Sequence, residues 1–396
     1  MRFLVAALLC TQLFAAEARK TPGLDVKRLA AIPTRMKALV DEGVGAGAVT
    51  LVMRHGIVAE FDAVGFQNLE SHTPMRTDSI FQIMSMTKPI TAVGVMMLVE
   101  DGKLALNEPV EKYLPEFKGQ SLVGEKKPVR PITLRDLLTH TSGMAGNPDD
   151  PIKDLPQKLN LTLAEAVAHY AKQPLEFEPG SKWQYSNIGI AALGRLIEVA
   201  SGKPYETFLA ERILTPLGMK DSFFYPPADK ISRIAIVYKK QGDKLVPAGG
   251  DILGGDPLNY RKGSKYPAPE WGMFSTAQDL SHFYLMVLNG GSYQGRKYLS
   301  KMSVDLMRRV HTNNVDNAGW LNPVRASYGL AFEVVHDPVT QLMLLNPGTF
   351  GHGGAFGTQG WIDPTTDLIR VLMVGVSGNS NDFRSAFLQM AGAAVE

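Results

Sequence analysis

The sequence predicts an α+β fold in which both ends of the chain build one mixed sheet and the middle forms an inserted helical lobe. Runs with strand-like alternation stand near both termini, whereas the long middle carries mostly helical patterns. Strands at both ends of a chain, around a middle without strands, favour one sheet that the two termini close together. A chain of 396 residues, 45% of them hydrophobic, is long enough to bury a large core.

The first 18 residues are predicted to be a secretory signal peptide, so that the mature domain would span residues 19–396. Arg2 is followed by an apolar run that is too short to span a bilayer, and Ala16-Glu17-Ala18 has the small residues of a cleavage site. Cleavage after Ala18 would remove Cys10, the one cysteine, and leave neither a disulfide nor a thiol nucleophile. A buried N-terminal helix is the alternative interpretation.

The remaining elements are predicted from hydrophobic spacing and from turn residues. Residues 25–42 have apolar side chains at helical spacing, and the two strands that follow are joined by a tight turn at His55-Gly56. Residues 84–100 are apolar almost all round, which is typical of a buried helix. Further helices are predicted at 188–200, 204–213, 276–288 and 382–395, and strands at 46–54, 57–65, 329–335, 342–345, 354–362 and 368–376.

Charge and motif content exclude several classes of function. The chain has 41 Lys and Arg against 39 Asp and Glu, a net charge of +2, so we expect no nucleic-acid partner. The eight histidines show no metal-ligand spacing, and the glycine-rich nucleotide motifs are missing, so we expect neither a metal nor a cofactor. No stretch after the leader is long and apolar enough for a membrane helix.

Ser85 and Lys88 have the spacing of a nucleophile and its base. Residues three apart on a helix share one face and lie within side-chain reach. A serine hydroxyl is a weak nucleophile until a base takes its proton, and lysine can be that base only if its pKa falls well below about 10.4. The apolar helix that Ser85 opens would desolvate Lys88 and lower its pKa. Because such pairs also arise by chance, ordinary helix surface is the alternative for this motif alone.

Two further segments have suitable chemistry. In Tyr185-Ser186-Asn187, a tyrosinate or a hydrogen-bonded phenol could shuttle a proton, and Asn187 could hold the lysine and the carbonyl side of the substrate. Alternatively, Asn187 caps the helix that begins at residue 188. In His352-Gly353-Gly354-Ala355, the glycines permit close approach of a ligand, and the N–H of Ala355 could form an oxyanion hole with that of Ser85. A glycine-rich hairpin is the alternative there.

At these residues the chain resembles the serine β-lactamase and penicillin-binding-protein superfamily, and within its class C-like group it is similar to the family VIII carboxylesterases. The resemblance implies an antiparallel sheet flanked by terminal helices, with a helical lobe at roughly 85–290 and the site between them. The segments that carry it occur in family order and cover most of residues 45–380. They are 85–91, 132–143, 185–187 with 193–194, 216–219 and 272–280.

The resemblance also implies roles. Ser85 would be the acylated nucleophile, Lys88 its proton acceptor and Tyr185 the proton shuttle, with Asn187 in support. The oxyanion hole would use the backbone of Ser85 and Ala355. His140, in the segment His140-Thr-Ser-Gly143, looks like part of a structural turn and is assigned no chemistry.

One departure from the family pattern favours esters as substrates. Many β-lactamases have Lys-Thr-Gly or Lys-Ser-Gly where this chain has His352-Gly353-Gly354. Histidine is mostly neutral near pH 7 and Gly353 has no hydroxyl, so a substrate carboxylate should be held poorly. We therefore expect an exported serine hydrolase that cleaves small carboxylic esters through an acyl-serine. A β-lactamase or D-alanyl-D-alanine carboxypeptidase is the alternative, and a non-catalytic penicillin- or peptide-binding module is another.

The walls of a substrate pocket are less well defined by the sequence. Five large aromatic residues in the second half of the chain are candidates, although core or surface packing is the simpler interpretation of each. They are Tyr260, Trp271, Trp320, Phe350 and Phe356.

Overall fold

The computed structural model describes residues 23–250, 252–256, 258–259, 261–313, 315, 327–336 and 345–396. The predicted signal peptide, most of the strand predicted at 342–345, and the pocket candidates Tyr260 and Trp320 lie outside these residues. Within them, no helix combines the length and the hydropathy needed to cross a membrane.

An eight-stranded antiparallel sheet forms the centre of the molecule, in the order β10-β11-β12-β13-β14-β1-β2-β3. β1 lies beside β14, with Ala48 opposite Val374, so strands from the two ends of the chain pair directly, as the sequence predicts. The strands are β1 (Gly47–Arg54), β2 (Ile57–Asn68), β3 (Thr73–Pro74), β10 (Ser327–Tyr328), β11 (Glu333–Val334), β12 (Phe350–Gly353), β13 (Gln359–Asp363) and β14 (Leu368–Val374).

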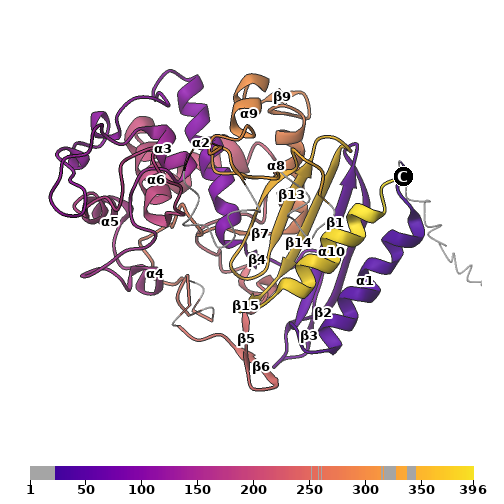
Figure 1. Ribbon diagram of the computed structural model, residues 1–396. Coiled ribbons are helices and arrows are strands. Elements are labelled where there is room, and N and C mark those ends of the chain that lie inside the picture. Colours follow the sequence, from indigo (N-terminus) through magenta and orange to yellow (C-terminus); the bar gives the residue numbers. More distant parts are fainter. Residues whose placement is uncertain are drawn as a thin grey trace, which may run out of the picture.

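The two terminal helices pack side by side on one face of this sheet (Figure 1). They are α1 (Val26–Asp41) and α10 (Asn381–Ala393), and their apolar faces form a core with the sheet. The amide of Asp25 donates to the carbonyl of Ala394 at 2.8 Å, which joins the start of α1 to the end of α10. α8 (Ala277–Leu288) also packs on the sheet, against β1, β13 and β14, and belongs to the larger core that is shared with the helical lobe.

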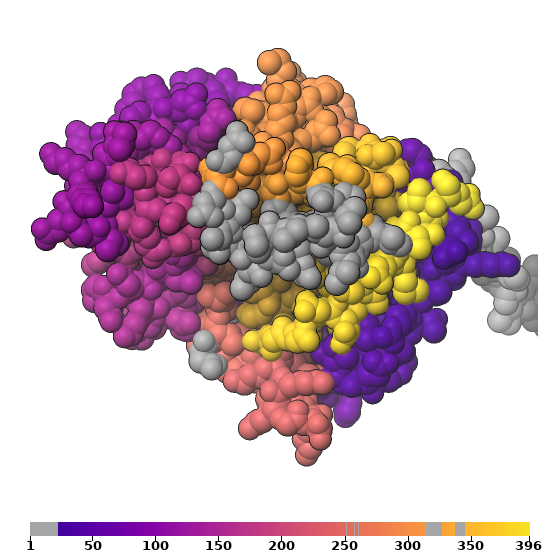
Figure 2. Space-filling model, viewed as in Figure 1, coloured from indigo at the N-terminus to yellow at the C-terminus, as the bar shows by residue number. Residues whose placement is uncertain are grey.

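The middle of the chain forms the helical lobe, which lies to one side of the sheet (Figures 1 and 2). Its central helix is α2 (Thr87–Glu100), whose residues from Thr87 to Leu98 are all buried, as its apolar sequence predicts. The other helices of the lobe are α3 (Leu134–Thr139), α4 (Leu155–Lys158), α5 (Leu163–Tyr170), α6 (Asn187–Ser201) and α7 (Tyr205–Leu209), which runs into a π-helical turn at Ala210–Leu214.

Short elements connect the sheet and the lobe. The two-stranded pair of β4 and β7 lies just before α2 and α8 in the chain, and β5, β6 and β15 form a small separate sheet. These elements are β4 (Phe81–Gln82), β5 (Tyr238–Gln241), β6 (Lys244–Pro247), β7 (Phe274–Ser275), β8 (Ser292–Tyr293), β9 (Arg296–Lys297), α9 (Lys301–Met307) and β15 (Val376–Ser377).

Four local predictions are corrected. The strand predicted at 329–335 is reduced to β11, because residues 329–332 form a turn in which Ala331 has a φ of +58°. The helix predicted from residue 84 begins as a separate 3₁₀ turn, Met84–Met86, before α2. The strand predicted at 354–362 begins only at β13, because Gly354–Gly357 forms a turn in which Gly357 has a φ of +91°. The cap of α6 is Ser186, whose hydroxyl accepts from the amide of Gly189, so Asn187 is not the cap.

Candidate active site

Ser85 stands in the 3₁₀ turn between β4 and α2. Met84, just before it, has a φ of +51°, which is uncommon for a residue with a side chain. The hydroxyl of Thr87, the first residue of α2, donates to the carbonyl of Met84 at 2.7 Å and so links the turn to the helix that follows it. Ser85 is partly exposed, whereas Met84, Met86 and Lys88 around it are buried. The tight turn thus brings one hydroxyl to the surface of an otherwise buried segment.

Lys88 lies in the first turn of α2 and is completely buried. Its Nζ donates to the Oγ of Ser85 at 3.0 Å and to the backbone carbonyl of Glu270 at 2.7 Å. Burial lowers the pKa of Lys88 to about 7, against the opposing effect of the Glu270 and Glu333 carboxyls. A large fraction of this amine is therefore neutral near pH 7 and can accept a proton from the hydroxyl beside it.

Tyr185 meets the same two side chains from the segment that precedes α6. Its ring centroid is 4.7 Å from the Nζ of Lys88, and its hydroxyl is hydrogen-bonded to Ser85. Burial raises the pKa of Tyr185, and the bond to Ser85 offsets only part of this effect. The group is consequently a phenol near pH 7, and of the two forms considered from the sequence the structure favours the phenol over the tyrosinate.

The segment from His352 to Ala355 runs from the end of β12 into the turn before β13. The hydroxyl of Thr358, in this turn, donates to the carbonyl of Ile83 at 3.1 Å, two residues before Ser85. Burial and the nearby Lys88 lower the pKa of His352 to about 3, so its ring is neutral near pH 7, as expected from the sequence. No hydrogen bond joins the amide of Ala355 to another described residue.

Replacing Gly354 by alanine is expected to disturb the contact between Thr358 and the carbonyl of Ile83. A Cβ there would lie 2.1 Å from the Oγ1 of Thr358 and 2.5 Å from the carbonyl of Ile83, so the turn would have to move away from Ser85. We expect a loss of about 1–3 kcal/mol in the free energy of unfolding, as in overpacked cores, and at least a tenfold lower kcat. Chemical denaturation and ester turnover measure the two effects. Gly250→Ala, where the nearest atom is 3.6 Å away, is the control; equal behaviour of both variants would contradict the close approach.

The other predicted site residues have mixed outcomes. The Nδ2 of Asn187 donates to the Oδ1 of Asn147 at 2.8 Å, a partner other than the Lys88 expected from the sequence. Trp271 is buried against Arg261, with the guanidinium carbon 5.4 Å from its ring centroid, and Phe350 and Phe356 belong to the core. Trp271 and Phe356 pack the interior, which is the alternative that the sequence left open, whereas Phe350 also lines a pocket at the end of α8.

Three residues near the site were not predicted from the sequence. Glu270 is buried, and its Oε1 accepts from the hydroxyl of Tyr266 at 3.0 Å; burial raises its pKa to about 7. Glu333, on β11, has a carboxyl that accepts from the amide of Gly353 and lies 3.6 Å from the Nδ1 of His352. Tyr328, on β10, bonds to His352. The available signal for Glu270 was an acidic residue just before the family segment at 272–280. Tyr328 and Glu333 lie on strands of two residues, which are too short to be predicted from the sequence.

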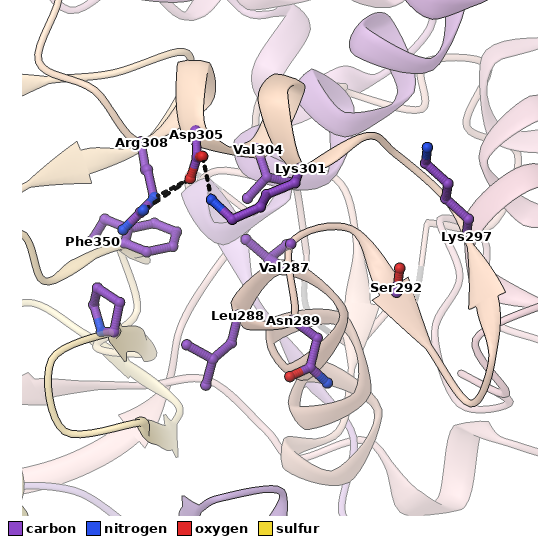
Figure 3. Close-up of a pocket in the computed structure, with 12 residues that line it drawn as sticks. Val287, Leu288, Asn289, Ser292, Lys297, Lys301, Val304, Asp305, Arg308 and Phe350 are labelled. Carbon is purple, nitrogen blue, oxygen red and sulfur yellow. Dashed lines mark hydrogen bonds and ion pairs between the residues drawn. The ribbon is translucent and has the colours of Figure 1, made fainter.

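A separate pocket lies at the end of α8 (Figure 3). It has a volume of about 460 Å³, and Lys301 and Arg308 converge there on the carboxylate of Asp305, at 2.5 and 2.9 Å. The carboxylate of Asp305 thus pairs with both cations. Its lining is Val287, Leu288, Asn289, Gly290, Ser292, Lys297, Lys301, Val304, Asp305, Arg308, Phe350 and Pro364. In the part of the chain that the structure describes, no three His, Cys, Asp or Glu side chains gather as a metal would require.

Comparisons with known proteins identify the family. The family model described as Beta-lactamase matches residues 34–394. Esterase EstB of Burkholderia gladioli is 31% identical over 382 residues, which cover 89% of this chain and 92% of that protein. A protein named putative D-alanyl-D-alanine carboxypeptidase, of Salmonella typhimurium, is 28% identical over 75% of this chain and 69% of its own.

A solved structure shows the same fold. EstCE1, described as a hydrolase with promiscuous acyltransferase activity, superposes with a TM-score of 0.80 at 24% identity and covers 94% of this chain and 99% of its own. The family expected from the segments around Ser85, Tyr185 and His352 is thereby confirmed, and so is the fold that it implied. The chain belongs to the Beta-lactamase family and is a serine hydrolase.

Proposed function

We propose that this chain is an exported enzyme that hydrolyses small carboxylic esters through an acyl intermediate on Ser85. The observation that carries the proposal is the distance of 3.0 Å between the Nζ of Lys88 and the Oγ of Ser85, together with the burial that lowers the pKa of this amine to about 7. The named activity of the relative EstB supports the ester as the substrate class. Export depends on the predicted leader; N-terminal sequencing of the exported protein should begin at Arg19.

The proposed reaction has two halves. Neutral Lys88 takes the proton of Ser85 as Oγ attacks the ester carbonyl, and the amides of Ser85 and Ala355 donate to the resulting oxyanion. The intermediate then collapses: the bond to the alcohol breaks, Tyr185 gives its proton to the departing oxygen, and the ammonium of Lys88 returns one to Tyr185. Water attacks the acyl-serine by the same proton route in reverse, which releases the acid and restores Ser85.

The proposed preference for esters rests on the strand beside Ser85. His352 is neutral and Gly353 has no hydroxyl, so this strand has no fixed positive charge for a substrate carboxylate. An ester with an uncharged acyl group needs none. A charge-assisted hydrogen bond contributes about 1.5–3 kcal/mol, so its loss would weaken the binding of β-lactam antibiotics and of peptides with a free carboxylate.

A second candidate, a β-lactamase or D-alanyl-D-alanine carboxypeptidase, is favoured by Arg384 on α10. Its Nε is buried and has no hydrogen-bond partner among the described residues, and its charge acts on Glu333 and His352. A substrate carboxylate could therefore find a cation there. The carboxyl of Glu333 already interacts with the charge of Arg384 and would compete with a substrate carboxylate, so we place this candidate second.

A comparison of three substrates distinguishes between the two candidate functions. The purified protein is assayed with p-nitrophenyl butyrate, with nitrocefin and with a peptide ending in D-Ala-D-Ala, and Ser85→Ala supplies the background. We expect the highest kcat/KM for the ester. A clear preference for nitrocefin or the peptide would reverse the order, and failure to turn over any of them or to react with a fluorophosphonate probe would favour a non-catalytic binding module.

The pH dependence tests the proposed base. Since Lys88 must be neutral to accept the proton, kcat/KM should rise with pH through about 7 and reach a plateau above it. Glu270→Gln should move this rise to lower pH, because the Glu270 carboxyl raises the pKa of Lys88. Rates over a range of about pH 5 to 9, with a substrate that is stable across it, measure both profiles. A profile that is flat through 7 would exclude Lys88 as the base.

A further inference from the structure

Three buried aromatic side chains link the segment that carries Tyr185 to the strand that carries Gly353. His140, Tyr328 and His352 are 1%, 1% and 2% exposed. The Nε2 of His140 is 3.2 Å from the hydroxyl of Tyr328, and the same hydroxyl is 3.0 Å from the Nε2 of His352. His140 is the left-handed C-cap of α3, with a φ of +59°, an uncommon conformation for a residue with a side chain.

A backbone group stands at each end of this chain of bonds. The amide of Ser186 donates to the Nδ1 of His140 at 3.1 Å. At the other end, the Nδ1 of His352 is 2.7 Å from the carbonyl oxygen of Gly353. Ser186 follows Tyr185 directly, and Gly353 comes two residues before Ala355, so the bonds connect two segments that are far apart in the sequence and adjacent in the candidate site.

The two backbone ends give the chain of hydrogen bonds one direction. An amide can only donate, so the Nδ1 of His140 must accept and its Nε2 must carry the hydrogen. That hydrogen occupies the Tyr328 oxygen, so Tyr328 donates its own hydrogen to the Nε2 of His352. The remaining hydrogen of His352 is then on Nδ1, where the carbonyl of Gly353 accepts it. In the reverse direction, Ser186 and His140 would present two hydrogens to each other.

The same side chains also contact Tyr185. The ring centroids of His140 and Tyr185 are 4.5 Å apart, and those of Tyr185 and His352 are 6.2 Å apart. Burial and the charge of Lys88 lower the pKa of both His140 and His352, so both rings are neutral near pH 7 and each holds one hydrogen. Because both rings are neutral, they place no second cation beside Lys88, and the hydrogen bonds between them keep a single direction.

We propose that His140, Tyr328 and His352 form a directed hydrogen-bond relay that positions the Gly353–Ala355 backbone against Tyr185 and Ser85. The inference rests on the proposed function, in which the Ala355 amide binds the oxyanion. His140 and Tyr328 are positioning residues that touch no reacting atom. Fixing the Gly353 carbonyl orients the peptide that follows, and therefore the approach of the Ala355 amide to the site. The relay gives a use to the His140 turn, to which the sequence assigned none.

Ring nitrogens report the relay directly and without any substrate. In protein labelled with ¹⁵N at histidine, a long-range ¹H–¹⁵N spectrum at pH 7 distinguishes the two tautomers of each neutral ring, and single histidine substitutions assign the signals. We expect the hydrogen on Nε2 in His140 and on Nδ1 in His352. The opposite tautomer at either ring would overturn the relay, whether or not the protein cleaves esters.

Tyr328→Phe tests what the relay does. Removing this hydroxyl leaves the Nε2 atoms of both histidines without their partner, so we expect about a tenfold lower kcat, a KM within about twofold, and a weaker preference of His352 for the Nδ1 tautomer. Tyr238→Phe is the matched control, because Tyr238 is also buried and its hydroxyl also makes two bonds: it accepts from the amide of Leu69 and donates to Glu70. Tyr238 lies on β5, in the small separate sheet. It should lose stability without a fall in kcat.

The outcomes separate this inference from the proposed function. An unchanged kcat in Tyr328→Phe, or an equal fall in both variants, would contradict a positioning role. If the wild-type protein cleaves no ester, the proposed function fails, and the tautomers of the unmodified protein still decide whether the relay exists.

Discussion

Replacing Ser85 by alanine is expected to lower kcat for ester hydrolysis by about a thousandfold or more, with little effect on folding. The hydroxyl of Ser85 contacts both Lys88 and Tyr185, at 3.0 Å from the Nζ of Lys88, and it is the group that we propose forms the acyl intermediate. Substrate turnover gives the rate. Mass spectrometry after brief exposure to the ester should show an acyl adduct on Ser85 in the wild-type protein and none in the variant.

Ser281→Ala is the control for this substitution. Ser281 is a buried serine on α8, and its hydroxyl donates within the helix to the carbonyl of Gln278 at 2.6 Å. Its replacement should leave kcat unchanged. Full activity of Ser85→Ala, or an adduct on another residue, would show that the nucleophile has been assigned to the wrong side chain.

Replacing Lys88 by methionine is expected to remove activity and, at pH 7, to increase stability. General base catalysis accounts for about 10²–10⁴ in rate, and methionine cannot accept a proton. Lys88→Arg should be equally inactive, because a guanidinium stays protonated in proteins. If the arginine variant kept the wild-type rate, the positive charge and not the base would be the function of Lys88. Lys118→Met, at an exposed position, is the control.

The gain in stability follows from the lowered pKa of Lys88. The unfolded chain holds a proton on this amine up to about pH 10.5, whereas the folded chain releases it near 7, so burial of Lys88 opposes folding by roughly 4 to 5 kcal/mol at pH 7. This penalty is fully present below 7 and disappears as the pH rises toward 10.5. The difference between the unfolding midpoints of Lys88→Met and the wild type should therefore shrink from pH 7 to 10. A difference that stayed constant would contradict the burial of a charged amine.

The sequence predicts those parts of the site that depend on residues close together in the chain. Ser85 and Lys88 are three residues apart, and the apolar run after them is sufficient to predict that the lysine is buried. Tyr185 was a candidate for its chemistry, but only the family resemblance placed it beside Ser85, because nothing in the spacing of residues 85 and 185 brings them together. The contact between the Lys88 amine and Glu270 could not be predicted, since the acceptor is a backbone carbonyl, which every residue has.

The parts that the sequence did not predict depend on contacts between distant segments. His140 bonds to Tyr328, 188 residues later, on β10, a strand of two residues that is too short to show alternation. The separate 3₁₀ turn at Met84–Met86 also depends on packing that the sequence does not show. The positive φ of Met84 is unfavourable by itself, and it persists because Thr87 and the surrounding core hold the turn. Ser186 and Asn187 are both good caps, and the carbonyl of Ala145, which accepts from the Ser186 hydroxyl at 2.7 Å, contributes to the choice between them.

The pairing of β1 with β14 has a consequence for biosynthesis. Ala48 and Val374 are neighbours in the sheet although roughly 320 residues separate them, and β1 has its second partner, β2, just after it in the chain. At ~5–20 residues per second on the ribosome, β1 waits about 15 to 65 s before β14 emerges. Throughout that time an apolar strand edge is open to other nascent chains, so the yield of folded enzyme should depend on chaperones that cover such edges during translation.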